Sequence, residues 1–173
     1  MKIISGKYKN TLLIGYDNKS TRATQARIRE SIIAIIKPYL EDKIFLDLFS
    51  GTGSIAFEAL SNGAKSIILN DNDKNAYNNL ILNKKKFTDE NIKIYNLDYK
   101  DLLNTMSDKV DIVYLDPPYN KYDYEEILKE IINSKILNKD ALIIIESSKK
   151  LSLNYPLLKE RKYGKKYIYI FMI

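Results

Sequence analysis

At 173 residues the chain is long enough for one well-buried domain, and its 45% hydrophobic and 29% charged residues are ordinary for a globular protein. Because it contains no Cys and no His, disulfides, thiolate or imidazole metal sites and histidine-dependent catalysis are excluded, and we expect no metal. The net charge of +6 favours a polyanionic partner, and no apolar run approaches the roughly 20 residues of a membrane span, so we expect a cytoplasmic protein with no membrane partner.

The first 22 residues contain short apolar runs that predict a β-hairpin or arm with a turn at Lys9 and Asn10. Apolar residues at helical spacing predict a helix over 24–40, which Pro38 limits near its end. Apolar runs and helical patterns then alternate. Strands are predicted at 44–49, 66–70, 92–97, 110–115 and 141–145, helices at 54–62, 73–86, 100–106 and 124–132, and a closing hairpin from 157–163 and 167–173.

This alternation predicts an α/β, Rossmann-like fold: a seven-stranded, mostly parallel sheet with helices on both faces and a C-terminal antiparallel hairpin. We expect a single domain over 1–173, with 1–22 as the arm and 23–173 as the helix and core. Parallel sheets bind ligands beyond the carboxyl ends of their strands. Since Asp47, Asp71, Asp98 and Asp116 all lie at or just after those predicted ends, the sequence predicts a site along this edge.

The segment after the first core strand has the features of a cofactor loop. Gly51 and Gly53 allow a tight turn and close approach of the backbone to a ligand. Asp71, about twenty residues later, can accept hydrogen bonds from ribose hydroxyls, and Asp98 can accept from an adenine amino group. These features indicate an adenosine pocket. The predicted cofactor contacts are Asp47, Phe49, Ser50, Gly51, Thr52, Gly53, Asp71, Asn72, Asp98 and Tyr99.

The glycines alone do not identify the adenosine, because Gly51-x-Gly53-x-x-Ala56 also fits a dinucleotide fingerprint. Asp47 favours S-adenosylmethionine, since a carboxylate can bind the ammonium of an amino-acid moiety and would repel a pyrophosphate. The acidic edge likewise suits a sulfonium and an ammonium better than two phosphates. The alternative is that Asp47 caps the following turn and Asp71 caps the next helix.

The predicted strand 110–115 stops in Asp116-Pro117-Pro118-Tyr119. Neither proline can continue a central strand, and a residue before proline is held extended, so Asp116 lies at a stiff exit from the sheet. This corner suits a planar base with an exocyclic amino group: Asp116 accepts one N–H, the carbonyl of Pro117 accepts the other, and Tyr119 stacks on the ring. The alternative is a surface turn with a helix-capping Asp.

Positive charge is concentrated at the two ends of the chain. Residues 1–43 hold nine Lys and Arg against four Asp and Glu, residues 147–173 hold seven against one, and the middle is acidic. This segregation predicts that the ends meet a polyanion, although the same residues would also suit a solvated surface. The candidate phosphate contacts are Lys7, Lys9, Arg22, Arg27, Arg29, Lys162, Lys165 and Lys166.

With these motifs in place, the chain resembles the RsmD-type small-subunit ribosomal RNA guanine-N2 methyltransferases almost end to end. The resemblance rests on residues 2–7, on Thr21-Arg22-Ala23-Thr24 with 27–30, on 47–53 with 58–64, on the Asp-Pro-Pro-Tyr tetrapeptide, and on Tyr163-Gly164. The tetrapeptide occurs in many amino-group methyltransferases, and the N-terminal combination narrows the choice. Departures from the family pattern are Ala23 for a proline, Asp71 for a glutamate and Ala56 for a glycine.

The resemblance implies a class I methyltransferase fold, S-adenosylmethionine as the cofactor with S-adenosylhomocysteine as the product, and methyl transfer to the N2 of one guanine in 16S ribosomal RNA. Asp116, Pro117, Pro118 and Tyr119 would be the catalytic residues. It further implies an N-terminal segment that contacts RNA, a substrate within a small-subunit assembly particle, and a monomer.

Other functions remain open at this point. The same corner serves methyltransferases of adenine N6, cytosine N4 or a protein glutamine amide, although 173 residues leave no room for a separate DNA-recognition domain. A non-catalytic RNA-binding assembly factor could retain the pocket for stability. A nicotinamide-dependent oxidoreductase would leave the Asp-Pro-Pro-Tyr corner unexplained.

Overall fold

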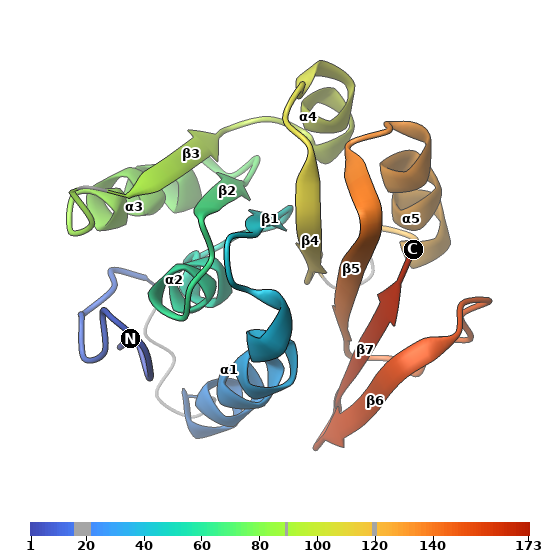
Figure 1. Ribbon diagram of the computed structural model, residues 1–173, viewed down its shortest axis with the longest axis horizontal. Helices are drawn as coiled ribbons and strands as arrows, with labels where there is room; N and C mark the ends of the chain where they lie inside the picture. Colours follow the sequence, from blue (N-terminus) through green and yellow to red (C-terminus); the bar gives the residue numbers. More distant parts are fainter. Residues whose placement is uncertain (16–21, 89, 119–120) are drawn as a thin grey trace.

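A computed structural model describes residues 1–15, 22–88, 90–118 and 121–173 (Figure 1). Within these ranges the chain forms a seven-stranded sheet in the order β3-β2-β1-β4-β5-β7-β6. The parallel strands are β1 (Ile44–Asp47), β2 (Ser66–Asn70), β3 (Asn91–Tyr95), β4 (Val110–Leu115) and β5 (Leu137–Ser147), and β7 (Lys166–Met172) runs antiparallel to both β5 and β6 (Leu157–Tyr163). The predicted mostly parallel sheet with a closing antiparallel hairpin is confirmed.

Helices cover both faces of the sheet, as predicted. α1 (Arg22–Ile36), α2 (Ser54–Ser61) and α3 (Lys74–Lys84) pack on one face, and α4 (Tyr99–Thr105) and α5 (Tyr124–Asn133) pack on the other. Successive strand residues point to opposite faces, so Phe45 of β1 packs in the first hydrophobic cluster and Leu46 in the second. The continuous apolar runs of the sequence therefore reflect strands that are buried on both sides.

Most predicted boundaries lie within two residues of the observed ones, and two elements differ by more. The helix predicted over 24–40 begins at Arg22 and ends at Ile36, because Pro38 lies in a separate 3₁₀ turn, Lys37–Tyr39. The fifth strand, predicted at 141–145, runs from Leu137 to Ser147. Residues 138–140 of this strand are polar and its register with β4 shifts between Val110 and Ile112, so only its buried centre carried the apolar signal.

The N-terminal segment, predicted as a β-hairpin or arm, is a short hairpin docked on the core. The turn at Asn10 is present, with φ 72°, but the strand pairing is a single bridge between Lys2 and Leu12. The backbone N–H of Lys7 donates to the carbonyl of Ser61 in α2 at 2.7 Å. A Cβ on Gly6 would lie 1.9 Å from that same carbonyl oxygen, so the close approach requires glycine.

The order of the strands creates a crevice between β1 and β4. After β1 the chain moves outward to β2 and β3, and it then returns to place β4 on the other side of β1. The segments that follow β1 and β4 therefore diverge at their carboxyl ends, which is where ligands bind in open α/β sheets. No helix in the described ranges combines the length and apolar character that spanning a bilayer requires.

Candidate active site

A cavity of about 400 Å³ opens at this crevice, a volume within the range of roughly 300–1,000 Å³ typical of small-molecule sites. Its walls come from the carboxyl ends of β1, β2, β4 and β5, from α1, and from the start of β7. The charged and aromatic side chains along these walls include Asp47, Asp71, Asp116, Glu146, Tyr122 and Lys166. The predicted edge of carboxylates is thus one side of a real cavity, with Asp98 as the exception.

Asp47 is the most unusual group in the cavity, because it is 1% exposed and carries a carboxylate. Among the residues that the structure describes, neither of its side-chain oxygens has a hydrogen-bond partner. Burial, together with the nearby charges of Asp71 and Asp116, raises the pKa of Asp47 well above its ordinary value. The N–H of Phe49 and the hydroxyl of Ser50 oppose this shift, but the Ser50 hydroxyl donates to the Asp47 carbonyl. A buried, unsatisfied carboxylate that lines a cavity is a site for a cation.

The loop after β1 is braced by Asp71. Its Oδ2 accepts from the N–H of Gly51 at 2.7 Å, and its Oδ1 accepts from the N–H of Asp73 at 2.9 Å. Gly51 has φ 52° and lines the cavity, as predicted for a loop that approaches a ligand. Gly53 is required for another reason: it does not line the cavity, and a Cβ there would lie 2.6 Å from Leu80, so it serves core packing.

Three aromatic rings gather beside the loop. Phe49 lies 5.5 Å from Tyr99 and 5.3 Å from Tyr122 between ring centroids, and Phe49 and Tyr122 line the cavity. Asp98 caps α4, where its side chain accepts from the N–H of Lys100 at 3.0 Å, and it does not line the cavity. Its predicted contact with adenine therefore stays a prediction, as does that of the buried Tyr99.

The Asp116 corner faces the cavity from the end of β4. Its side chain is 34% exposed, and its Oδ1 lies 3.4 Å from Nζ of Lys166. Burial and the nearby Glu146 raise the pKa of Asp116 to about 7, and Lys166 opposes the rise. Pro118 also lines the cavity, Pro117 is buried behind it, and Tyr119 lies outside the described residues.

These donors and acceptors fit S-adenosylmethionine. Asp47 offers an unpaired buried carboxylate for the ammonium, Asp71 lines the cavity where ribose hydroxyls are predicted, and Phe49 offers an aromatic face. Asp116, another carboxylate acceptor, lies on a different wall of the same cavity. In the described part of the chain, no group of three or more acidic side chains could hold a metal ion.

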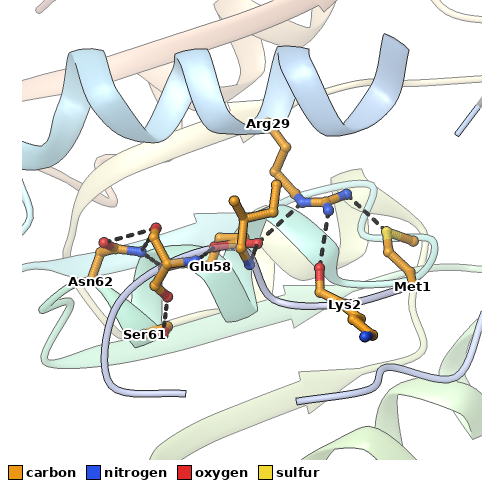
Figure 2. Close-up of polar contacts among 8 residues, drawn as sticks. Met1, Lys2, Arg29, Glu58, Ser61 and Asn62 are labelled. Carbon is orange, nitrogen blue, oxygen red and sulfur yellow. Dashed lines mark hydrogen bonds and ion pairs between the residues drawn. The ribbon is translucent and has the colours of Figure 1, made fainter. Parts of the chain in front are cut away.

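Two of the predicted phosphate contacts have other partners. Arg29 is 7% exposed, and its guanidinium donates to Glu58 at 3.3 Å and to the carbonyl of Lys2 at 3.1 Å. Figure 2 shows both contacts. Lys166 lies inside the cavity and is paired with Glu146. Both residues line the cavity and have internal partners, so their predicted contacts with phosphates stay predictions.

The remaining basic candidates are placed differently. Lys7 is exposed and lies 2.7 Å from Glu90, which raises its pKa. The exposed candidates are Lys9, Arg27, Lys162 and Lys165, and the side chain of Arg22 lies outside the described residues. A hydrogen bond between Ser31 of α1 and Tyr163 joins the exposed face of α1 that carries Arg27 to the β6–β7 hairpin.

Glu146 and Tyr122 line the cavity but were missed from the sequence. Glu146 follows the apolar run 141–145 directly, so it is a carboxylate at the carboxyl end of a strand, the same signal that identified Asp47 and Asp116. The predicted strand ended one residue too early to include it. Tyr122 carried no comparable signal, because its contact with Phe49 joins segments that are far apart in the sequence.

Comparisons with known proteins agree with this geometry. A family model described as Conserved hypothetical protein 95 matches residues 1–172. The chain is 32% identical over 221 residues to Uncharacterized methylase RP545 of Rickettsia prowazekii, covering 95% of this chain and 94% of that protein. It is 31% identical over 172 residues to Ribosomal RNA small subunit methyltransferase D of Haemophilus influenzae, covering 95% and 89%. The solved structure of the Escherichia coli protein yhhF matches with a TM-score of 0.87 at 26% identity, covering 99% and 97%.

Proposed function

Because this chain belongs to the Conserved hypothetical protein 95 family, the RsmD-type methyltransferases, we propose that it methylates the exocyclic N2 of a guanine in 16S ribosomal RNA with S-adenosylmethionine. The observation that carries the proposal is that Asp47 and Asp116 line one cavity, the first as an unpaired buried carboxylate. One group suits the cofactor's ammonium and the other suits the substrate's amine. A dinucleotide cofactor leaves both unexplained.

The bound cofactor supplies an electrophilic methyl group on a sulfonium leaving group. The N2 lone pair of guanine is delocalised into the ring, so N2 is a poor nucleophile unless its geometry changes. Hydrogen bonds from its protons to Asp116 and to the carbonyl of Pro117 would favour a pyramidal nitrogen with its lone pair directed at the methyl. As the N2–C bond forms and the S–C bond breaks, one N2 proton must leave. A carboxylate whose pKa is about 7 is well matched to accept it at neutral pH.

The RNA would approach over α1 and the β6–β7 hairpin. Residues of α1, including Gln25 and Ile32, line the cavity, and so does Lys166 at the start of β7. The exposed Arg27, Lys162 and Lys165 belong to these same two elements and can contact phosphates. In this proposal Tyr119 stacks on the extruded base, residues 1–173 act as one domain and as a monomer, and the substrate is 16S RNA within an assembling small subunit.

Nucleoside mass spectrometry tests the proposal directly. The protein is incubated with S-adenosylmethionine and, in parallel, with naked 16S RNA, with small subunits from cells that lack the protein, and with duplex DNA. We expect N2-methylguanosine from one or both ribosomal substrates. N6-methyladenosine, N4-methylcytidine or methylated DNA would replace the proposed substrate, and cofactor binding without any methylated product would favour an assembly factor.

A further inference from the structure

A charged cluster lies beside Asp116 that the proposed mechanism does not use. Nζ of Lys166 is 2.7 Å from Oε1 of Glu146 and 3.4 Å from Oδ1 of Asp116. The other carboxylate oxygen of Glu146 accepts from the hydroxyl of Tyr114 at 2.8 Å. Lys166 therefore bridges two carboxylates, and Tyr114 fixes the far side of one of them.

The register of the sheet explains how these side chains meet. Tyr114 pairs with Ile144 and Asp47 pairs with Tyr114, while Glu146 pairs with Ile168 across the antiparallel β5–β7 ladder. Side chains two residues apart on a strand share a face. Lys166 consequently shares the face of Glu146, which in turn shares the face of Tyr114 and Asp47. All belong to the face that α1 and α2 cover, where the cavity lies.

The burial of the cluster separates it from an RNA-binding surface. The side chains of Lys166 and Glu146 are 19% and 9% exposed, and the Lys166 ammonium already lies against the Glu146 carboxylate. An ion pair of this burial loses much of its solvation, and it is retained by good geometry and additional hydrogen bonds such as that from Tyr114. Its position against Asp116 gives it a use in the reaction.

We infer that Lys166 and Glu146 are a positioning pair for Asp116, in which the Lys166 ammonium, anchored by Glu146, keeps the Asp116 carboxylate ionised and in place to accept the N–H of the substrate amine. This inference rests on the proposed function, because it assigns the pair a role toward the same substrate. Neither residue touches the reacting atoms in this scheme.

The two members of the pair act on Asp116 with opposite sign. Burial and the negative charge of Glu146 raise the pKa of Asp116, and the positive charge of Lys166 lowers it. Titratable groups face Asp116 from every neighbouring element: Asp47 from β1, Tyr114 from β4, Tyr124 from α5, Glu146 from β5 and Lys166 from β7. Tyr114 and Tyr124 stay neutral near pH 7, because burial raises the pKa of each.

The test is the pH dependence of methyl transfer together with a direct titration of Asp116. In single-turnover assays with saturating cofactor, the rate should fall at low pH as Asp116 becomes protonated, and we call this fall the acidic limb of the rate profile. Lys166→Met should move the limb to higher pH by about one pH unit, and Glu146→Gln should move it to lower pH by a similar amount. Lys166→Arg should restore most of the wild-type profile. The matched control is Lys139→Met, an exposed lysine near the other end of β5, which should leave the limb unchanged.

The titration uses ¹³C-labelled carboxyl carbons, with the Asp116 signal identified by its loss in Asp116→Asn. It requires no methyl transfer, so it separates the two proposals. Opposite shifts of the Asp116 midpoint in Lys166→Met and Glu146→Gln support the positioning pair even where the methylated product is not N2-methylguanosine.

Midpoints that stay unchanged, or that move in the same direction, overturn the inference even where N2-methylguanosine forms. Should Lys166→Met not fold, Glu146→Gln decides alone, since it preserves the acceptor for Tyr114. A midpoint that fails to fall in that variant overturns the pair.

Discussion

Two ion pairs among the described residues have little solvent exposure and differ in their surroundings. Arg29 pairs with Glu58 between α1 and α2, and Lys166 pairs with Glu146 beside the cavity. Around the first pair, Glu58 also accepts from the N–H of Ile4 at 2.5 Å, and Arg29 donates to the carbonyl of Lys2 (Figure 2). The first pair also contacts Sδ of Met1, which does not ionise, whereas the second pair lies beside two ionisable side chains, Asp116 and Tyr114.

This difference indicates what each pair does. Backbone partners fix the position of a chain segment, so Arg29 and Glu58 hold residues 1–5 against the two helices. Ionisable side-chain partners respond to charge, so Lys166 and Glu146 bear on the protonation and orientation of Asp116. The first pair should therefore affect stability most when it is broken, and the second should affect the pH dependence of the reaction.

Breaking the Arg29–Glu58 pair should give the largest change in stability. Glu58→Gln leaves the Arg29 guanidinium, which is 8% exposed, without its counter-charge, and removing one partner of a buried pair costs about 3–5 kcal/mol. Urea denaturation measures the loss. Arg29 lines the cavity, but the acidic limb of the rate profile should stay in place, because the charges that shift the pKa of Asp116 are those of Glu146 and Lys166.

The matched control for that change is Glu126→Gln, which breaks an exposed pair with Lys100, 53% and 46% exposed, and should leave the denaturation midpoint unchanged within error. Equal destabilisation by Glu58→Gln and Glu126→Gln would contradict the role of the Arg29–Glu58 pair. A shift of the acidic limb of the rate profile in Glu58→Gln would show that both pairs affect the protonation of Asp116.

Asp47 differs from the acidic residues of both ion pairs, since it is a buried carboxylate with no hydrogen-bond partner among the described residues. Asp47→Asn should stabilise the cofactor-free protein by about 1–3 kcal/mol at pH 8, because a neutral amide costs less to bury than an unpaired carboxylate, and raise its melting temperature by about 2–4 °C per kcal/mol. Affinity for S-adenosylmethionine should fall by at least ~10-fold, or 1.4 kcal/mol, because the ammonium loses its counter-charge.

The pH dependence of that stabilisation has a definite sign. Burial raises the pKa of folded Asp47 above the ordinary 3.8, so its contribution to stability is complete below that value and is lost as pH rises through the folded-state pKa. The advantage of Asn should therefore grow with pH in melting experiments. A variant that is less stable at pH 8, or that binds the cofactor normally, would show that Asp47 serves only the fold.

The smallest effects are expected from the exposed lysines of the hairpin. Lys162→Gln and Lys165→Gln should each weaken RNA binding a few-fold and reduce the slope of log affinity against log salt by about 0.7–0.9 for each phosphate that the variant no longer neutralises. Filter binding between low and physiological salt measures the slope, with Lys139→Gln as the control. An unchanged slope in the double variant would remove the hairpin from the RNA interface.

Local signals allowed much of the fold and half of the site to be predicted. Three features could be recognised from neighbouring residues alone, because local sequence determines their conformation. They are the strand predicted at 44–49, the glycines after it and the turn at Asp116. Asp47, Asp71 and Asp116 line the cavity as the carboxyl-end rule predicts.

The remaining parts depend on contacts between distant segments. Arg29 looked like a surface cation because its partners, Glu58 and the carbonyl of Lys2, meet it only after residues 1–5 dock between two helices. Lys166 looked like a turn lysine because the register of β5 with β7 is not visible in either strand alone. Helical or strand periodicity reports which face is buried, and it does not report which charges meet there.

The central claim is that Asp116, at the carboxyl end of β4, holds the substrate amine beside the methyl group of a cofactor anchored elsewhere in the same cavity. The most direct measurement compares single-turnover methyl transfer and calorimetric cofactor affinity for the wild-type protein and Asp116→Asn. We expect the rate to fall by at least ~100-fold while the affinity changes by less than about threefold, because the interaction that is removed is made with the amine. A near-normal rate, or a loss of cofactor affinity that parallels the loss of rate, would contradict this account.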